Sequence, residues 1–239
     1  MGHQQSAIRK GFTFVELLVV MSIIVLVIAL AVPMFNLITG SRSIDAAANT
    51  VSATLGRAHA QALGLQQNVG VAFWVNASSG RTAMAVVSVD PSSSDPRFVD
   101  VVADFDLEQL PPGVSAQFVY NCTFNASGQR TSDGYIRQPA LIMFDGHGQL
   151  ISTPYAIRAA SRLGGLVGLS SDFNVASARS QFGLVLYESA PFADQGFDDN
   201  AFFTSGTYDP AKDTWLDQNA MPYMVNRYNG TLIKAENVK

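Results

Sequence analysis

Apolar residues are distributed unevenly along the chain, and the longest run of them lies near its beginning. Residues 17–32 contain no charged residue, and Ser22 is the one polar side chain among them. Such a run is typical of a helix that contacts a membrane or other apolar helices. Pro33 follows at once, and because proline lacks a backbone N–H and clashes with the preceding turn, it predicts a helix kink. The pattern therefore predicts a transmembrane helix over residues 12–33.

The next segment, residues 34–66, has the spacing of an amphipathic helix. Apolar residues recur three and four positions apart, and charged residues fall between them, as on a helix with one buried face. Gly64 is the predicted end of this helix. We name residues 34–66 the stem. Its apolar positions are Ile44, Ala47, Ala48, Val51, Leu55, Ala58, Ala62 and Leu65.

The rest of the chain, residues 67–239, changes to short β-rich runs separated by turns. We name this part the head, and we expect a mostly antiparallel sheet structure in it. Together with the N-terminal helix, it predicts an α+β fold in which the stem packs on the β-rich head. The predicted strands cover residues 69–75, 82–89, 98–103, 114–120, 141–144 and 182–187.

Turn signals interrupt the head. Asn229-Gly230 is the pair that best suits a two-residue type I′ hairpin turn, and it predicts that residues 223–228 pair with residues 231–233. Residues 121–139 and 189–221 are long and irregular, so we expect surface insertions there. The second insertion is acidic, with Lys212 as its single basic residue.

Three interpretations of residues 1–33 compete: a cleaved secretory signal, a plain membrane anchor, and a leader followed by a helix that stays in the mature protein. Arg9 and Lys10 precede the apolar run, and residues 29–31 would serve as a small-x-small cleavage site. Glu16 argues against the first two interpretations, and the alternative is that its carboxylate, near the end of the segment, reaches the headgroup layer. A carboxylate one turn inside an apolar segment costs about 2–4 kcal/mol if it goes deep into a membrane, and secretion does not require that cost.

The residues around Glu16 resemble a known signal. The stretch Arg9-Lys10-Gly11-Phe12-Thr13-Phe14-Val15-Glu16-Leu17-Leu18-Val19-Val20 is similar to the cleavage and methylation motif of type IV prepilins. This resemblance implies that residues 1–11 are a leader, that a membrane-embedded prepilin peptidase cuts between Gly11 and Phe12, and that the new amino group of Phe12 is methylated. The basic pair would hold the leader on the cytoplasmic side.

The resemblance also implies an assembly role for Glu16. In a filament, its carboxylate would lie beside the ammonium group of a neighbour's Phe12, so that the opposite charges offset each other's desolvation and set the axial register. The expected partners are the prepilin peptidase, other pilin or pseudopilin subunits, the inner-membrane assembly platform and membrane lipid. The expected location is a single pass through the inner membrane with the head in the periplasm, and then the filament.

The stem narrows the resemblance further. Residues 43–65 are similar to the stems of GspH/FimT-type minor pseudopilins. The sequence therefore predicts a structural subunit of a type II secretion pseudopilus or a type IV pilus, and not an enzyme.

The charge balance bears on a second interpretation, in which the chain is a DNA-capturing minor pilin similar to FimT. The formal charge is −4 and the isoelectric point is near 5.2, which argues against DNA as a partner because phosphate affinity comes from clustered Lys and Arg. Cleavage after Gly11 would also remove Arg9 and Lys10 and make the mature chain more acidic. The basic residues available late in the chain are Arg227, Lys234 and Lys239.

Other candidate chemistry has simpler explanations. Asp145-Gly146-His147-Gly148 predicts a hairpin turn rather than a metal or acid–base site, and no nucleophile elbow, P-loop or HExxH motif is present. Cys122 stands alone and predicts a small buried side chain. We therefore expect no metal, no cofactor and no catalytic residues. A calcium site in the acidic insertion is the weaker alternative to a solvated loop, with Asp194, Asp198, Asp199 and Asp209 as its candidate ligands.

Overall fold

A computed structural model of the 239-residue chain gives its fold. The chain divides into two compact units, Met1–Arg42 and Ser43–Lys239, so the boundary falls inside the first helix. The structure describes residues 14–76, 79–89, 98–102, 106–119, 134–136, 140–152, 154–157, 177–197 and 209–235.

The first helix, α1, covers Phe14–Leu65 and is 52 residues long. It joins the predicted apolar segment to the predicted stem, and it is assigned as helix through Pro33. The side chains of residues 29–42 lie outside the described residues, so the kink at Pro33 stays a prediction.

The helix ends one residue after Gly64, at Leu65. Gln66 takes a left-handed conformation with φ of 52°, and the N–H of Gln67 donates to the carbonyl of Ala62 at 3.3 Å. This six-to-one bond after a left-handed residue is the Schellman arrangement, which satisfies carbonyls left open at a helix end. The predicted end of the helix at Gly64 is one residue from the observed end at Leu65. The left-handed residue that ends the helix is Gln66 and not Gly64.

One sheet, which we name sheet A, has eight strands among the described residues. Its order is β10-β9-β3-β2-β1-β7-β8, and β4 pairs with β2 beside this path. The pairs are antiparallel except β3 with β9. The strands are β1 (Val69–Val75), β2 (Thr82–Val89), β3 (Phe98–Val101), β4 (Glu108–Gln109), β7 (Ala140–Phe144), β8 (Leu150–Ile151), β9 (Pro154–Ile157) and β10 (Ser177–Arg179).

The second sheet, sheet B, has five strands in the order β13-β12-β11-β5-β6, and all of its pairs are antiparallel. The expectation of an α+β fold with a mostly antiparallel head is confirmed. The strands are β5 (Val114–Val119), β6 (Tyr135–Ile136), β11 (Gly183–Glu188), β12 (Met221–Val225) and β13 (Leu232–Lys234).

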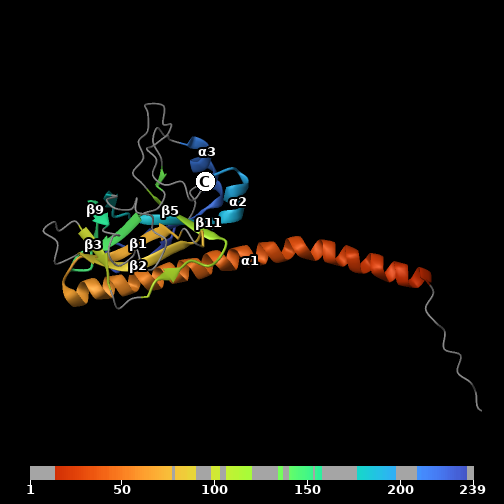
Figure 1. The fold of residues 1–239 in the computed structure, drawn as a ribbon, viewed down its shortest axis with the longest axis horizontal. Coiled ribbons are helices and arrows are strands. Elements are labelled where there is room, and N and C mark those ends of the chain that lie inside the picture. The colour runs from red at the N-terminus through yellow and green to blue at the C-terminus, as the bar shows by residue number, and fades with distance from the viewer. Residues whose placement is uncertain are drawn as a thin grey trace, which may run out of the picture. The chain divides into compact units, whose positions relative to one another are not determined.

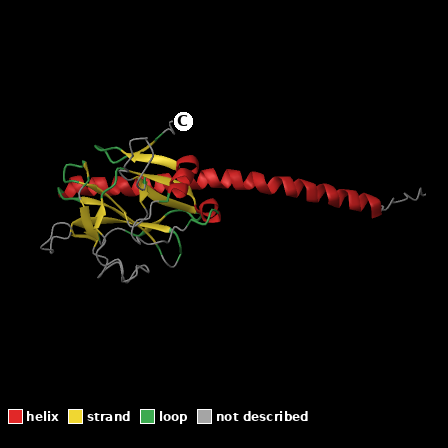
Figure 2. Ribbon diagram, turned by 90° about the horizontal axis from the view of Figure 1, so that it is seen from above, coloured by secondary structure: helices red, strands yellow, loops and turns green. Residues whose placement is uncertain are grey.

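The main core lies where residues 43–65 of α1 meet both sheets. Side chains from the helix, from β1, β2 and β7 of sheet A, and from β5, β11 and β12 of sheet B form one buried cluster. Figure 2 shows that strands of the head gather along this part of the helix. The helix contributes Ala47, Val51, Leu55, Ala58 and Ala62, which are all fully buried, so the predicted buried stripe is confirmed at these positions.

The expectation that residues 189–221 are irregular is wrong for much of their described part, which covers residues 189–197 and 209–221. This segment contains two helices, α2 (Ser189–Asp194) and α3 (Pro210–Asn219), and both contact β11 (Figure 1). Phe192 and Leu216 are buried against the outer face of sheet B with Val185 and Tyr187. Apolar side chains on that face need cover, and these two helices provide it.

The hairpin of β12 and β13 is confirmed, but the predicted two-residue turn is wrong. Val225 pairs with Leu232, so the connection spans residues 226–231. The N–H of Gly230 donates to the carbonyl of Asn226 at 3.0 Å, and Gly230 has φ of 67°. Asn229 accepts from the backbone N–H and the hydroxyl of Thr231. These side-chain bonds favour a wider loop than the Asn-Gly pair alone suggests.

Other predicted loops are only partly covered. Of the insertion at residues 121–139, the described part is residues 134–136, which include β6. The remainder of that insertion, with Cys122, lies outside the described residues.

Glycine at position 70 is required by the pairing of β1 with β7. A Cβ at Gly70 would meet the carbonyl oxygen of Ile142 and would lie 2.8 Å from the Cα of Met143. Because these atoms belong to backbone, we expect Gly70→Ala to lower the free energy of unfolding by about 1–3 kcal/mol. Urea denaturation of the detergent-solubilised protein measures this.

Gly56 provides the matched control, because a Cβ there meets no atom within 4 Å. It lies inside α1, where alanine is favoured over glycine by about 1 kcal/mol. Gly56→Ala should therefore raise the free energy of unfolding. A loss of stability at Gly56 equal to that at Gly70 would contradict the strand-pairing argument.

Candidate functional site

The predicted processing site precedes the described residues. Arg9, Lys10, Gly11 and Phe12 all lie outside them, so cleavage between Gly11 and Phe12 stays a prediction. Helix α1 begins at Phe14, two residues after the predicted new terminus.

Glu16 lies in the first turn of α1, with an exposed side chain. A carboxylate there is stabilised by the backbone N–H groups at the helix N-terminus. If the mature chain begins at Phe12, the carboxylate of Glu16 lies four residues after the terminal ammonium group. The position is compatible with the predicted pairing between subunits, which itself stays a prediction.

The apolar residues that follow Glu16 are exposed on every side of the helix. From Phe14 to Ile28, the exposed fraction of the large apolar side chains runs from 46% at Ile24 to 80% at Phe14. A helix that is apolar all round is stable where lipid or other apolar helices cover it.

Ser22 is the polar side chain within this stretch, and its hydroxyl donates to the carbonyl of Val19 at 2.7 Å. The hydroxyl is therefore satisfied inside the helix itself. This lowers the cost of placing Ser22 in an apolar environment, where an unpaired hydroxyl is expensive.

No helix among the described residues has the length and apolarity that crossing a membrane requires. The predicted membrane span over residues 12–33 is therefore not shown by the structure.

The predicted turn at residues 145–148 is confirmed, and it connects β7 to β8. The carboxylate of Asp145 accepts from the backbone N–H groups of His147 and Gln149 at 2.9 and 2.8 Å, and Gly148 has φ of 76°. Asp145 therefore shapes the turn. Among the described residues, no group of three or more His, Cys, Asp or Glu side chains is arranged to hold a metal ion.

His59 lies on α1 where two turns of the head meet the helix. Its Nε2 is 3.3 Å from the carbonyl oxygen of Tyr228, and its ring meets Phe144 edge-on, with centroids 5.3 Å apart. A Cβ at Gly148 would lie 2.7 Å from Nε2 of His59. These contacts give His59 a packing role between the helix and the β7–β8 and β12–β13 turns.

The acidic insertion uses one of its candidate calcium ligands as a helix cap. Asp209 precedes Pro210, the first residue of α3, and its side chain accepts from the N–H groups of Ala211 and Lys212 at 3.1 and 3.2 Å. This is an N-cap with proline at the first helical position. Asp194 is exposed at the end of α2, whereas Asp198 and Asp199 lie outside the described residues.

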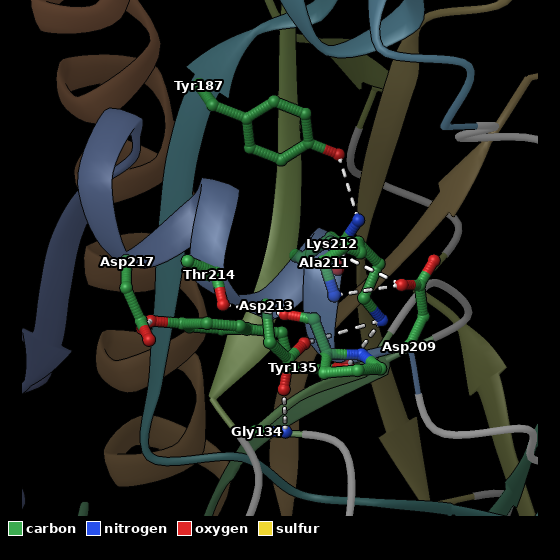
Figure 3. A network of polar contacts seen from close by, with 11 residues as sticks. Gly134, Tyr135, Tyr187, Asp209, Ala211, Lys212, Asp213, Thr214 and Asp217 are labelled. Carbon is green, nitrogen blue, oxygen red and sulfur yellow. Dashed lines mark hydrogen bonds and ion pairs between the residues drawn. The ribbon is translucent and has the colours of Figure 1, made fainter.

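Helix α3 carries a buried pair of charges that sequence reasoning missed. Nζ of Lys212 lies 3.7 Å from the carboxylate of Asp213, and the two side chains are 4% and 2% exposed. Asp213 accepts from the N–H of Gly134 at 2.7 Å, and Lys212 donates to the carbonyl of Tyr135 at 3.4 Å. Figure 3 shows the side chains of Lys212 and Asp213 directed at the backbone of residues 134–135.

A third residue of α3 holds the same segment. The hydroxyl of Tyr135 donates to the carboxylate of Asp217 at 2.6 Å (Figure 3). Helix α3 is therefore fastened to β6, the edge strand of sheet B. The pair Asp209-Pro210 is a local signal that could have indicated the start of α3, but nothing local indicates that Lys212 and Asp213 are buried.

Tyr223 of β12 faces the stem. Burial raises the pKa of its phenol, and the carboxylate of Asp45 on α1 raises the pKa further. Both effects disfavour the phenolate. The side chain therefore stays protonated and neutral in the core.

The basic residues proposed for DNA are only partly described. Arg227 is exposed in the β12–β13 turn, and Lys234 is exposed opposite Tyr223 at the other end of the hairpin. Lys239 lies outside the described residues. Two exposed cations at opposite ends of one hairpin do not form the cluster that phosphate binding requires.

Comparison with known proteins gives one match. Residues 7–32 match the family model described as the prokaryotic N-terminal methylation motif. No curated protein and no solved structure matches the chain. The match contains the whole stretch from Arg9 to Glu16 and all of the apolar run at residues 17–32. The chain thus carries the methylation motif, which supports a type IV prepilin-like protein processed by prepilin peptidase.

Proposed function

We propose that this chain is a minor pilin or pseudopilin, a structural subunit of a type II secretion pseudopilus or a type IV pilus. The observation that carries the proposal is the coincidence of two features. The methylation motif covers residues 7–32, and the apolar side chains from Phe14 to Ile28 are exposed all round the helix. The motif supports cleavage by a prepilin peptidase. The exposed apolar side chains are stable where lipid or other apolar helices surround the helix.

The steps of the function follow the order of the chain. The basic pair Arg9 and Lys10 keeps the leader in the cytoplasm, and residues 12–33 hold the chain in the inner membrane. Prepilin peptidase cuts between Gly11 and Phe12 and methylates Phe12. The apolar helix then leaves lipid and packs against the helices of other subunits, with Glu16 beside a neighbour's terminal ammonium group.

The head has a structural role in this proposal, with no catalysis and no cofactor. Residues 43–65 of α1 are fixed to both sheets through the main core, so the head is carried on the same helix that enters the filament. Within the prepilin-like proteins, we assign the chain to the GspH/FimT type, on the resemblance of residues 43–65.

Processing is tested by co-expression with a prepilin peptidase and the assembly platform. The wild type should lose residues 1–11 and appear in the sheared filament fraction. Gly11→Val places a branched side chain at the scissile position, so it should leave the precursor uncut in the membrane. Wild-type protein that stays full-length with an active peptidase would contradict the proposal.

A further inference from the structure

Each sheet contains a glycine covered by a methionine of the neighbouring strand. Gly70 pairs with Met143 across β1 and β7, and Gly183 pairs with Met224 across β11 and β12. A Cβ at Gly70 would meet the sulfur of Met143, and a Cβ at Gly183 would lie 2.8 Å from the sulfur of Met224. In both pairs, the flexible thioether fills the space that the glycine leaves open.

The two pairs differ in their exposure to solvent. Met143 is fully buried, whereas Met224 is 41% exposed. Side chains alternate between the faces of a strand, so Gly183 shares its face with Val185 and Tyr187, which α2 and α3 cover. That cover ends before Met224 and its cross-strand neighbour Ile233, which is 51% exposed. The thioether of Met224 is therefore accessible at the uncovered end of sheet B.

We propose that Met224 is a site of reversible oxidation that controls how tightly β12 pairs with β11 at Gly183. The oxidant class is a peroxide. A lone pair on the sulfur attacks one oxygen of hydrogen peroxide, the O–O bond breaks, and the thioether becomes a sulfoxide while the peroxide is reduced to water. A dithiol-dependent sulfoxide reductase reverses the step, since two thiols become a disulfide and the oxygen leaves as water.

Oxidation changes what the side chain does on the sheet. The thioether is apolar and polarisable, and it lies over the backbone at Gly183. The sulfoxide is polar and prefers water, so the side chain leaves this position. Because Gly183 has no side chain of its own, the backbone of the β11–β12 pair is then open to solvent. We therefore expect faster local opening at this pair and no loss of the main core.

The first experiment measures the site of oxidation on the full chain in detergent. The protein is treated with hydrogen peroxide, digested, and analysed by mass spectrometry for the gain of one oxygen at each methionine. Susceptibility follows exposure, so Met224 should react on the order of tenfold faster than Met143 and Met84, both of which are fully buried. Met143 is the matched control, because it has the same cross-strand glycine. Equal rates for Met143 and Met224 would overturn the proposal.

The second experiment measures the consequence by amide hydrogen exchange across β11 and β12. Oxidised wild type should exchange severalfold faster there than reduced wild type, and a sulfoxide reductase should restore the slow rate. Met224→Leu keeps an apolar cover and has no sulfur, so the same peroxide dose should leave its exchange unchanged. Exchange that is equal in oxidised and reduced wild type, or that rises as much in Met224→Leu, would overturn the proposal.

Discussion

Glu16→Ala is expected to lower the amount of protein in filaments about tenfold or more, while the leader is still removed. In a filament of this variant, the terminal ammonium group of a neighbour's Phe12 would lie among apolar helices without the carboxylate that balances its charge. Removing one partner of a buried ion pair costs about 3–5 kcal/mol, and each 1.4 kcal/mol is a factor of about ten in an equilibrium. Immunoblotting of the sheared filament fraction against the membrane fraction measures the change.

Two variants make this test specific. Glu16→Gln keeps the shape of the side chain and removes its charge, so it should lose incorporation nearly as strongly as Glu16→Ala. Asp45 is an exposed carboxylate further along α1, and Asp45→Ala should assemble like the wild type. Normal incorporation of Glu16→Gln would show that the charge of Glu16 does not set the register.

Asp213→Ala is expected to lower the free energy of unfolding of the head by about 3–5 kcal/mol, because it leaves the charge of Lys212 buried without its carboxylate. It also removes the acceptor of the Gly134 N–H. Trp215 on the same helix lies 5.3 Å from Phe192 and 6.0 Å from Tyr187, measured between ring centroids. Its fluorescence in a urea titration therefore follows the release of α3 from sheet B, together with the signal of the second tryptophan, Trp74, which is buried in a cluster of sheet A.

The paired substitution separates the charge from the hydrogen bond. Lys212→Met with Asp213→Asn removes both charges, keeps an oxygen for the Gly134 N–H, and should restore most of the lost stability. Asp194 at the exposed end of α2 is the matched control, and Asp194→Ala should stay within about 0.5 kcal/mol of the wild type. A double variant as unstable as Asp213→Ala would show that the ion pair is not the cause.

Local patterns predicted much of the fold. The bounds of β1 and β2 agree with the predicted strands at residues 69–75 and 82–89, because each run is rich in apolar and β-branched residues and is followed by turn signals. The buried stripe of the stem followed from helical spacing alone. The end of α1 was displaced because Gln66, a non-glycine residue, takes the left-handed position.

Helix α3 shows why the rest could not be predicted. Its buried face includes Lys212 and Asp213 beside Leu216, so the polar-apolar alternation that normally reveals an amphipathic helix is absent. These charges are tolerated inside because Gly134 and Tyr135, more than seventy residues earlier in the chain, supply a donor and an acceptor. A contact at that sequence separation leaves no local signal.

The candidate processing site has the opposite character. Gly11, Phe12 and Glu16 lie within six consecutive residues, and the basic pair directly precedes them, so their spacing is readable without a fold. The family match over residues 7–32 agrees with that local signal. Their role in assembly depends on neighbouring subunits, which one chain does not contain.

In the proposed function, the mature chain begins at Phe12 and keeps its apolar helix. Intact-mass and N-terminal analysis of the membrane-extracted protein, expressed with a prepilin peptidase, tests it most directly. We predict a chain that starts with N-methylated Phe12 and retains Glu16. A chain that starts at Val32 would contradict this claim, because the leader and the apolar helix would then be a secretory signal and no filament helix would remain.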